Sequence, residues 1–300
     1  MLTVESLVRI LKKPMGIIKI DGEILSFLEV NEPFCALSGY TREELMKVDP
    51  HLMLAREQSN PAFTQLENDQ FLKTEVTVLS KDHLNVILEV ELYLIDDGPN
   101  QLIIVFADHI SSKKWIDHQI ANNPILCSGV VNSSYIMTRY DMYFDPIVDH
   151  KSRFEQESIF ELIAKADHPV MKKLLEEIKQ TKQTKEVVLR TTKLADQLEL
   201  KMKIMVRPFF DGVGTFLEYA FVISQLELFE VSADPAVRLK VLMAQRNMSA
   251  QSLSEATNIT IQTISKLRNG KVTKPQLLTA QLIAGELGVA VSDIWAETRR

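Results

Sequence analysis

Cysteine is scarce in this chain of 300 residues, which contains only Cys35 and Cys127. The two are far apart and lie among apolar residues, and neither belongs to a Cys-x-x-Cys pair or a Cys/His cluster. Structural disulfides and zinc sites need such pairs or clusters, so we expect neither, and no other metal site is indicated. Both thiols are predicted to be buried side chains without a chemical role.

Glycine is also scarce, with ten residues scattered along the chain. The sequence has no phosphate-binding loop, no glycine-rich dinucleotide fingerprint, no GxSxG elbow and no HExxH motif. These motifs position the reactive groups of common enzyme classes. We therefore expect a protein that is not an enzyme, and we assign Asp96 and Asp97 to a turn between strands.

Long apolar runs are missing as well, since none approaches the roughly 18 to 20 residues that a membrane-spanning helix needs. The first residues, MLTVESLVRILKKP, have neither the apolar core nor the cleavage site of a signal peptide. We expect a cytoplasmic protein without a membrane partner.

What the chain does contain is an ordinary globular composition, with 46% hydrophobic and 25% charged residues, in a length that suggests two or three domains. The net charge of −6 is unevenly distributed. From Pro235 to Arg300 there are nine basic and four acidic residues, a net charge of +5, so the first 234 residues carry −11. Nucleic acid would be attracted only by this basic segment.

Helices are predicted throughout the basic segment, and the second and third of them are joined by a short turn. Ser249 is a suitable N-cap for the second helix, which we expect to bury Leu253 and Ala256, and Asn258 tolerates the left-handed conformation of a tight turn. The third helix begins at Thr260 and is expected to bury Ile264 and Leu267. A fourth helix begins at Pro275, and its predicted inward residues are Leu277, Leu278, Leu282, Ile283 and Leu287.

The run SAQSLSEATNITIQTISKLRNGK, followed by KPQLLTAQLIAGELGVAVSDIW, resembles the Cro and phage-repressor (XRE) family of helix-turn-helix domains. The resemblance covers 235–300 and implies that the third helix enters the major groove of double-stranded DNA. By position it implies that Ile261, Gln262 and Lys266 read bases. Gln suits adenine, Lys suits guanine, and Ile suits a thymine methyl group.

Other positions of this segment are better placed for phosphates, which fix the register without reading sequence. The phosphate-binding candidates are Gln251, Thr263, Asn269, Lys271 and Lys274. The family often has Gln one residue into the second helix, where this chain has Ala250, with Gln251 next to it. The alternative is a four-helix protein-interaction module that exposes Gln and Lys.

The acidic part begins with a region, 14–110, in which two strands are followed by small helices and a three-stranded meander. Thr41 and Glu44 form a T-x-x-E capping box before one of the helices. This order, with VNEPFCALSGYTREEL, resembles a PAS domain, a five-stranded sensor fold that holds a ligand between sheet and helices.

The region 123–226 repeats the order with lower fidelity, and we interpret it as a second, degenerate PAS-like domain with two long final strands. Residues 111–122 are predicted to form a linker helix, and residues 1–13 an N-terminal helix. The expected fold class is α+β, with two PAS-like domains and an all-α helix-turn-helix domain.

Cofactor signatures of the PAS family can be compared with this sequence. Flavin-binding members carry an NCRFLQ-like stretch where this chain has Asp49, Pro50 and His51, and heme-binding members carry a histidine on a connecting helix where 61–72 has none. We expect neither flavin nor heme, but a small organic ligand remains compatible. The candidates for lining its pocket are Phe27, Phe34, Tyr40, Leu92 and Phe106.

These features predict a transcriptional regulator that binds DNA sequence-specifically and is controlled by a small molecule or a cellular state. The expected form is a homodimer on a pseudo-palindromic operator. In the alternative, the PAS-like domains serve only dimerisation or partner docking and hold no ligand.

Overall fold

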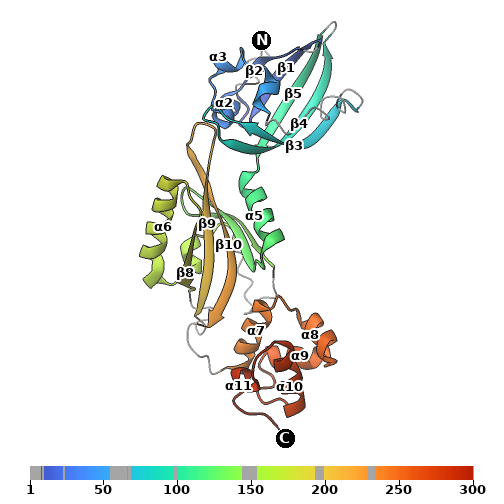
Figure 1. Ribbon diagram of the computed structural model, residues 1–300, viewed down its shortest axis with the longest axis vertical. Helices are drawn as coiled ribbons and strands as arrows, with labels where there is room; N and C mark the ends of the chain where they lie inside the picture. Colours follow the sequence, from blue (N-terminus) through green and yellow to red (C-terminus); the bar gives the residue numbers. More distant parts are fainter. Residues whose placement is uncertain are drawn as a thin grey trace. The chain divides into compact units, whose positions relative to one another are not determined.

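The computed structural model describes residues 8, 10–22, 24–54, 66, 69–97, 100–143, 154–192, 199–228 and 234–299 (Figure 1). The chain divides into two compact units. Unit 1 contains Met1–Trp115 and Phe209–Leu217, and unit 2 contains Ile116–Pro208 and Glu218–Arg300. The two are described separately.

Unit 1 is built on an antiparallel five-stranded sheet with the strand order β2-β1-β5-β4-β3. The strands are β1 (Met15–Asp21), β2 (Ile24–Val30), β3 (Phe71–Leu79), β4 (Asn85–Asp97) and β5 (Asn100–His109). Three short helices follow β2 in the chain: α2 (Glu32–Ser38), α3 (Arg42–Leu45) and the 3-10 helix η1 (Pro50–Met53). Helix α2 contacts β1, and α3 and η1 contact β2. The predicted capping box of Thr41 and Glu44 opens α3.

Alternation along β4 decides which face of this sheet meets the helices. Val86, Leu88, Val90 and Leu92 are all buried. They belong to one apolar core with residues of α2, η1 and the other strands. The sheet therefore presents an apolar face to the helices, as the period of two predicts.

Asn31 joins the start of the sheet to α2 through four hydrogen bonds. Its Oδ1 accepts from the amides of Met15 (2.9 Å) and Phe34 (3.0 Å), and its Nδ2 donates to the carbonyls of Leu11 (3.1 Å) and Lys13 (2.7 Å). An amide side chain has two donors and two acceptor lone pairs, so this buried group is fully satisfied.

The turn between β9 (Leu200–Phe210) and β10 (Phe216–Leu228) is the part of the late chain that belongs to unit 1. The Gly212 amide donates to the Ala36 carbonyl of α2 at 3.0 Å. The backbones approach so closely that a Cβ on Gly212 would lie 2.3 Å from the Leu37 carbonyl oxygen. Glycine at this position lets the two backbones come so near, because it has no Cβ.

Unit 2 contains a second antiparallel five-stranded sheet, with the order β7-β6-β10-β9-β8. Its remaining strands are β6 (Cys127–Asn132), β7 (Met137–Met142) and β8 (Lys185–Arg190), and it is accompanied by η2 (Ile159–Leu162), η3 (Lys165–Asp167) and α6 (His168–Thr181). When the strands of each sheet are numbered from one in chain order, the two sheets have the same strand order, 2-1-5-4-3. The predicted fold class, two PAS-like sheets with helices and an all-α segment, is confirmed.

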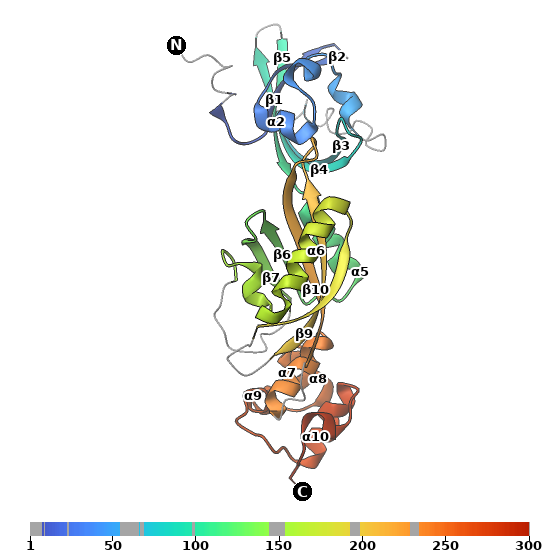
Figure 2. The same ribbon diagram turned by 90° about the vertical axis from the view of Figure 1, so that its left-hand side faces the viewer.

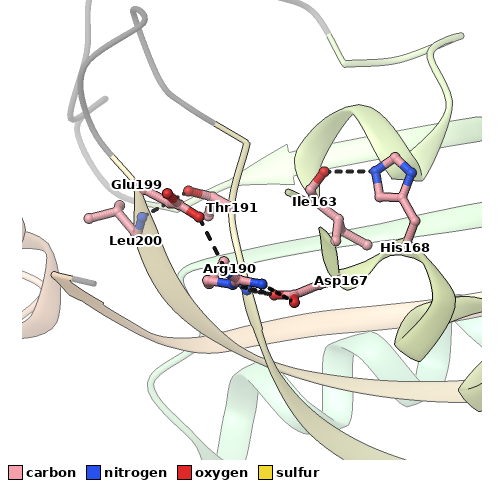
Figure 3. Close-up of polar contacts among 7 residues, drawn as sticks. All are labelled: Ile163, Asp167, His168, Arg190, Thr191, Glu199 and Leu200. Carbon is pink, nitrogen blue, oxygen red and sulfur yellow. Dashed lines mark hydrogen bonds and ion pairs between the residues drawn. The ribbon is translucent and has the colours of Figure 1, made fainter. Parts of the chain in front are cut away.

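The segment before α6 is tied to β8 by a polar cluster (Figure 3). The Asp167 carboxylate accepts from the Arg190 backbone amide (2.8 Å), Nε (3.0 Å) and Nη2 (2.6 Å). These hydrogen bonds from Arg190 hold the pKa of the Asp167 carboxyl below its usual value. Next to it, Nε2 of His168 is 2.9 Å from the Ile163 carbonyl oxygen. The cluster satisfies its own charges, which is typical of a structural role.

Because the pKa of Asp167 is lowered in the folded state, its ion pair stabilises the protein above the unfolded pKa of about 3.9 and is lost as the pH falls through the folded value. We expect Asp167→Asn to lower the free energy of unfolding by about 1 to 2 kcal/mol at pH 7 and to flatten its acid dependence. Urea unfolding at pH 7 and pH 3 measures both. Glu177→Gln on α6, which removes an exposed partner of Lys185, is the control and should have little effect. Equal losses in the two variants would contradict this role for Asp167.

The sequence also predicts a linker helix over 111–122 and an N-terminal helix over 1–13. α5 (Ser111–Asn122) lies where the sequence predicts a linker helix. Of the predicted N-terminal helix 1–13, Val8 and Ile10 are helical and 11–13 are not, while the rest falls outside the described residues. The carbonyls of Leu11 and Lys13 bond Asn31 instead of continuing a helix, and Pro14 follows.

The C-terminal part of unit 2 is helical and has its own core (Figure 2). Its helices are α7 (Pro235–Gln245), α8 (Ala250–Thr257), α9 (Ile261–Arg268), α10 (Leu277–Glu286) and α11 (Val291–Ile294). Leu239, Leu253, Ile264, Ile283 and Trp295 are buried together at the centre. Among the described residues, none of the helices is long and apolar enough to cross a membrane.

Candidate nucleic-acid interface

Helices α8 and α9 are joined by a turn of three residues that begins at Asn258. Asn258 adopts the predicted left-handed conformation, with φ 55° and ψ 24°. The Ser254 hydroxyl of α8 donates to the carbonyl of Ile259 in the turn at 2.6 Å. The Thr260 side chain then accepts from the Thr263 amide and caps α9. The turn is thus held by local hydrogen bonds at both ends.

Helix α9 has one buried and one exposed side. Ile264 and Leu267 are 0% and 1% exposed, as the spacing of three predicts. Ile261 is 49% exposed, and Gln262 and Lys266 are also exposed. Gln262 and Lys266 are four residues apart and therefore lie on the same side of the helix. The exposed side combines an apolar contact, an amide and a cation.

Unit 1 has a cavity, and three of the five residues predicted to line a ligand pocket lie in its wall. Phe27, Phe34 and Leu92 line a cavity between the sheet and the helices, and the rings of Phe27 and Phe34 meet edge to face at 5.7 Å. Tyr40 lines a different, open hollow that it shares with Glu32 and Arg42. Tyr40 packs against the same apolar core but is not among the residues that line the cavity.

Phe106 is also wrongly placed by the sequence analysis, because it lies on the other face of the sheet. It packs with Val8, Met15 and Ile17 in a separate apolar cluster, and the Lys13 Nζ lies 5.8 Å above its ring. Its neighbours Val105 and Ala107 face the cavity instead.

The cysteines and two histidines are not arranged as ligands. Burial raises the pKa of the Cys35 thiol to about 11 and that of Cys127 to about 12, so both are protonated at neutral pH. His51 lies in η1 beside Asp49, and His83 lies in the turn between β3 and β4. In the described ranges, no three His, Cys, Asp or Glu side chains gather in a way that could hold a metal ion.

Comparison with protein families identifies the helical segment. Residues 238–296 match the Cro/C1-type helix-turn-helix DNA-binding domain. This helix-turn-helix (HTH) domain includes α8, the turn and α9. No curated protein matches the chain.

Solved structures are similar to other parts of the chain. One is a PAS domain of an HTR-like protein from Haloarcula marismortui, 22% identical, which covers 36% of this chain and 88% of that one with a TM-score of 0.31. Another is a domain of a sensory box sensor histidine kinase/response regulator from Geobacter sulfurreducens, 24% identical, with coverages of 34% and 89% and a TM-score of 0.29. The PAS-like character of the two sheets rests on their strand order and helices.

The phosphate-binding candidates of the HTH domain have different surroundings. Lys271 is exposed just after α9, whereas Lys274 is paired with Glu297. Gln251 is exposed on α8 and donates to Glu255 at 3.1 Å. The hydroxyls of Thr263 and of the cap residue Thr260 form a hydrogen bond of 2.9 Å. The side-chain amide of Asn269 is 3.5 Å from the Ser265 hydroxyl.

Ser265 is a residue that the sequence analysis missed. It is exposed on α9, three residues after Gln262 and next to Lys266. The same helical period that placed Gln262 and Lys266 outside could have found it. Its hydroxyl can contact either a base or a phosphate.

Several core assignments in the HTH domain need correction. Thr257, not Ala256, is the buried neighbour of Leu253, because its hydroxyl donates to the Leu253 carbonyl at 2.6 Å and leaves only its methyl group to pack. In α10, Leu277, Leu278 and Leu282 are 44%, 67% and 43% exposed. Ala280, Ile283, Ala284 and Leu287 form the buried side of this helix and of the residue that follows it.

Proposed function

We propose that the protein is a sequence-specific DNA-binding transcriptional regulator whose PAS-like domains sense a small molecule or a cellular state. The observation that carries the proposal is the exposed side of α9 in an HTH domain of the Cro/C1 type. In this class of domain the second helix of the motif lies in the major groove and contacts base edges.

The chemistry of the exposed side suggests a role for each residue. Gln262 would pair with adenine N6 and N7, Lys266 would donate to guanine O6 and N7, and Ile261 would contact a thymine methyl group. Thr263, Asn269, Lys271, Lys274 and Gln251 would contact phosphates. Lys274 would first have to leave Glu297, an exposed pair that costs little to break.

The proposed assembly is a cytoplasmic homodimer. Two HTH domains would bind half-sites about 34 Å apart on a pseudo-palindromic operator. Selection of bound sequences from a random pool by the purified chain tests this, since it should return an inverted repeat with that spacing. A single half-site, or no enrichment, would contradict the dimeric arrangement or the DNA-binding function, respectively.

Lys271 allows the phosphate role to be separated from base reading. We expect Lys271→Ala to weaken binding to selected and random DNA by the same factor and to lower the slope of log K against log salt by about one. Fluorescence anisotropy over a salt series measures both quantities. Lys173→Ala, which removes an exposed charge of α6, is the control. A loss confined to the selected sequence would instead make Lys271 a base-reading residue.

If the cavity of unit 1 holds no ligand, a second function is favoured. In that case the PAS-like domains would serve dimerisation or partner docking. Removal of the HTH domain would then leave a dimer that responds to no small molecule.

A further inference from the structure

The first PAS-like domain has a partly open cavity of about 100 Å³ between its sheet and its helices. Residues from all five strands, α2 and η1 contribute to its lining. Protein interiors contain few voids larger than one water molecule, and a water needs about 10 to 15 Å³ of such volume. This cavity is several times larger than ordinary packing leaves.

The lining that the structure describes is almost wholly apolar. It consists of Ile18, Phe27, Phe34, Leu37, Ser38, Pro50, Met53, Leu54, Val76, Val78, Leu88, Val90, Leu92, Val105 and Ala107. Among the described residues of the lining, Ser38 is the one with a polar side chain, and its hydroxyl donates to the Cys35 carbonyl at 3.3 Å and lies 3.5 Å from the Tyr40 amide. Water or a charged group in this cavity would lose its hydrogen bonds to solvent and find almost none in return.

We propose that this cavity binds a small, uncharged, apolar molecule about the size of benzene, such as a simple aromatic hydrocarbon. A cavity of about 150 Å³ lined by Leu, Ile and Phe stays dry and binds benzene or xenon in another protein. The signalling role of the ligand rests on the proposed function, whereas its binding does not.

The lining does not fit the larger cofactors of sensor domains. A flavin ring has a polar edge of amide and carbonyl groups, and the Ser38 hydroxyl, the one polar side-chain group of the described lining, already bonds the Cys35 carbonyl and cannot satisfy that edge. A heme needs an axial ligand, and no His or Cys is found among the lining residues that the structure describes.

The same helix that lines the cavity also holds the turn between β9 and β10. Phe34, Leu37 and Ser38 face the cavity, and the Ala36 carbonyl between them accepts the hydrogen bond of Gly212. A ligand that moves α2 would therefore disturb a contact to strands that continue toward the HTH domain in the sequence. The ligand changes the position of α2 only if it binds one position of the helix more tightly than another.

Benzene, toluene and benzoate, tested on the full chain, examine the proposal directly. At ten times its dissociation constant, benzene should raise the midpoint of thermal unfolding by about 3 °C, and benzoate should have no effect. Ala107→Leu fills the cavity and should weaken benzene binding at least about tenfold, measured by NMR titration. Ile104→Leu, on the same strand but off the cavity lining, is the matched control.

Val90→Ile adds a single methylene to the lining and provides a milder variant should Ala107→Leu fail to fold. It should weaken benzene binding more than Ile104→Leu does. Equal shifts with benzene and benzoate, or unchanged affinity in both cavity variants, would overturn the proposal. DNA binding is measured in the same samples, so benzene binding without any change in DNA affinity would support the cavity assignment and remove only the sensing role.

Discussion

The double variant Gln262→Ala/Lys266→Ala binds its selected operator at least about 30-fold more weakly than the unchanged chain, because each side chain is expected to contribute about 1 to 3 kcal/mol of base discrimination. Both side chains are exposed on α9, so their removal leaves the core residues Ile264 and Leu267 untouched. Affinity for random DNA should fall much less, since phosphate contacts dominate it.

Anisotropy titrations with selected and random duplexes measure the two affinities, and circular dichroism confirms that the variant is folded. Gln281→Ala, which truncates an exposed glutamine on α10, is the matched control and should bind as the unchanged chain does. Equal losses on selected and random DNA would show that these residues do not read bases.

Gly212→Val separates the turn between β9 and β10 from α2, and we expect a large loss of stability in unit 1. A Cβ at Gly212 would lie 2.3 Å from the Leu37 carbonyl oxygen and 2.5 Å from the Gly39 amide nitrogen. Neither backbone atom can move without shifting the end of α2. Overpacking of this kind typically costs about 1 to 3 kcal/mol or more.

Urea unfolding measures the loss, and hydrogen exchange at the Gly212 amide reports on the bond to Ala36. Gly285→Ala on α10 is the matched control, because nothing lies within 4 Å of the added Cβ. It should be neutral or stabilise the helix by about 0.5 to 1 kcal/mol. A Gly212→Val variant as stable as the control would show that the turn does not pack on α2.

The sequence predicted best where one local pattern decides the structure. The capped turn at Asn258 and the buried side of α9 depend on neighbouring residues and on a period of three to four. The same is true of β4, in which apolar and charged residues alternate. Local sequence therefore sufficed to predict that Ile264 and Leu267 are buried and that Gln262 and Lys266 are exposed.

The sequence predicted the buried face of an element less well where apolar residues are continuous. The run LIIVF in β5 is apolar on both faces of the sheet, so periodicity could not tell that Phe106 faces away from the cavity while Val105 faces it. The leucines of α10 pose the same problem, and three of them lie at the surface.

Long-range contacts could not be predicted at all. Asn31 bonds backbone groups 16 to 20 residues earlier in the chain, and Gly212 bonds Ala36. Asn31 belongs to the stretch VNEPFCALSGYTREEL, but nothing in that stretch indicates its distant partners, and Gly212 belongs to no motif. Each depends on segments that are brought together only by the folded sheets.

Base reading by α9 is tested by the ratio of the affinities of the full chain for its selected duplex and for random DNA at physiological salt. If the exposed side of α9 reads base edges, this ratio should be about 1,000 or more. A ratio near one, with DNA bound through charge alone, would contradict the account.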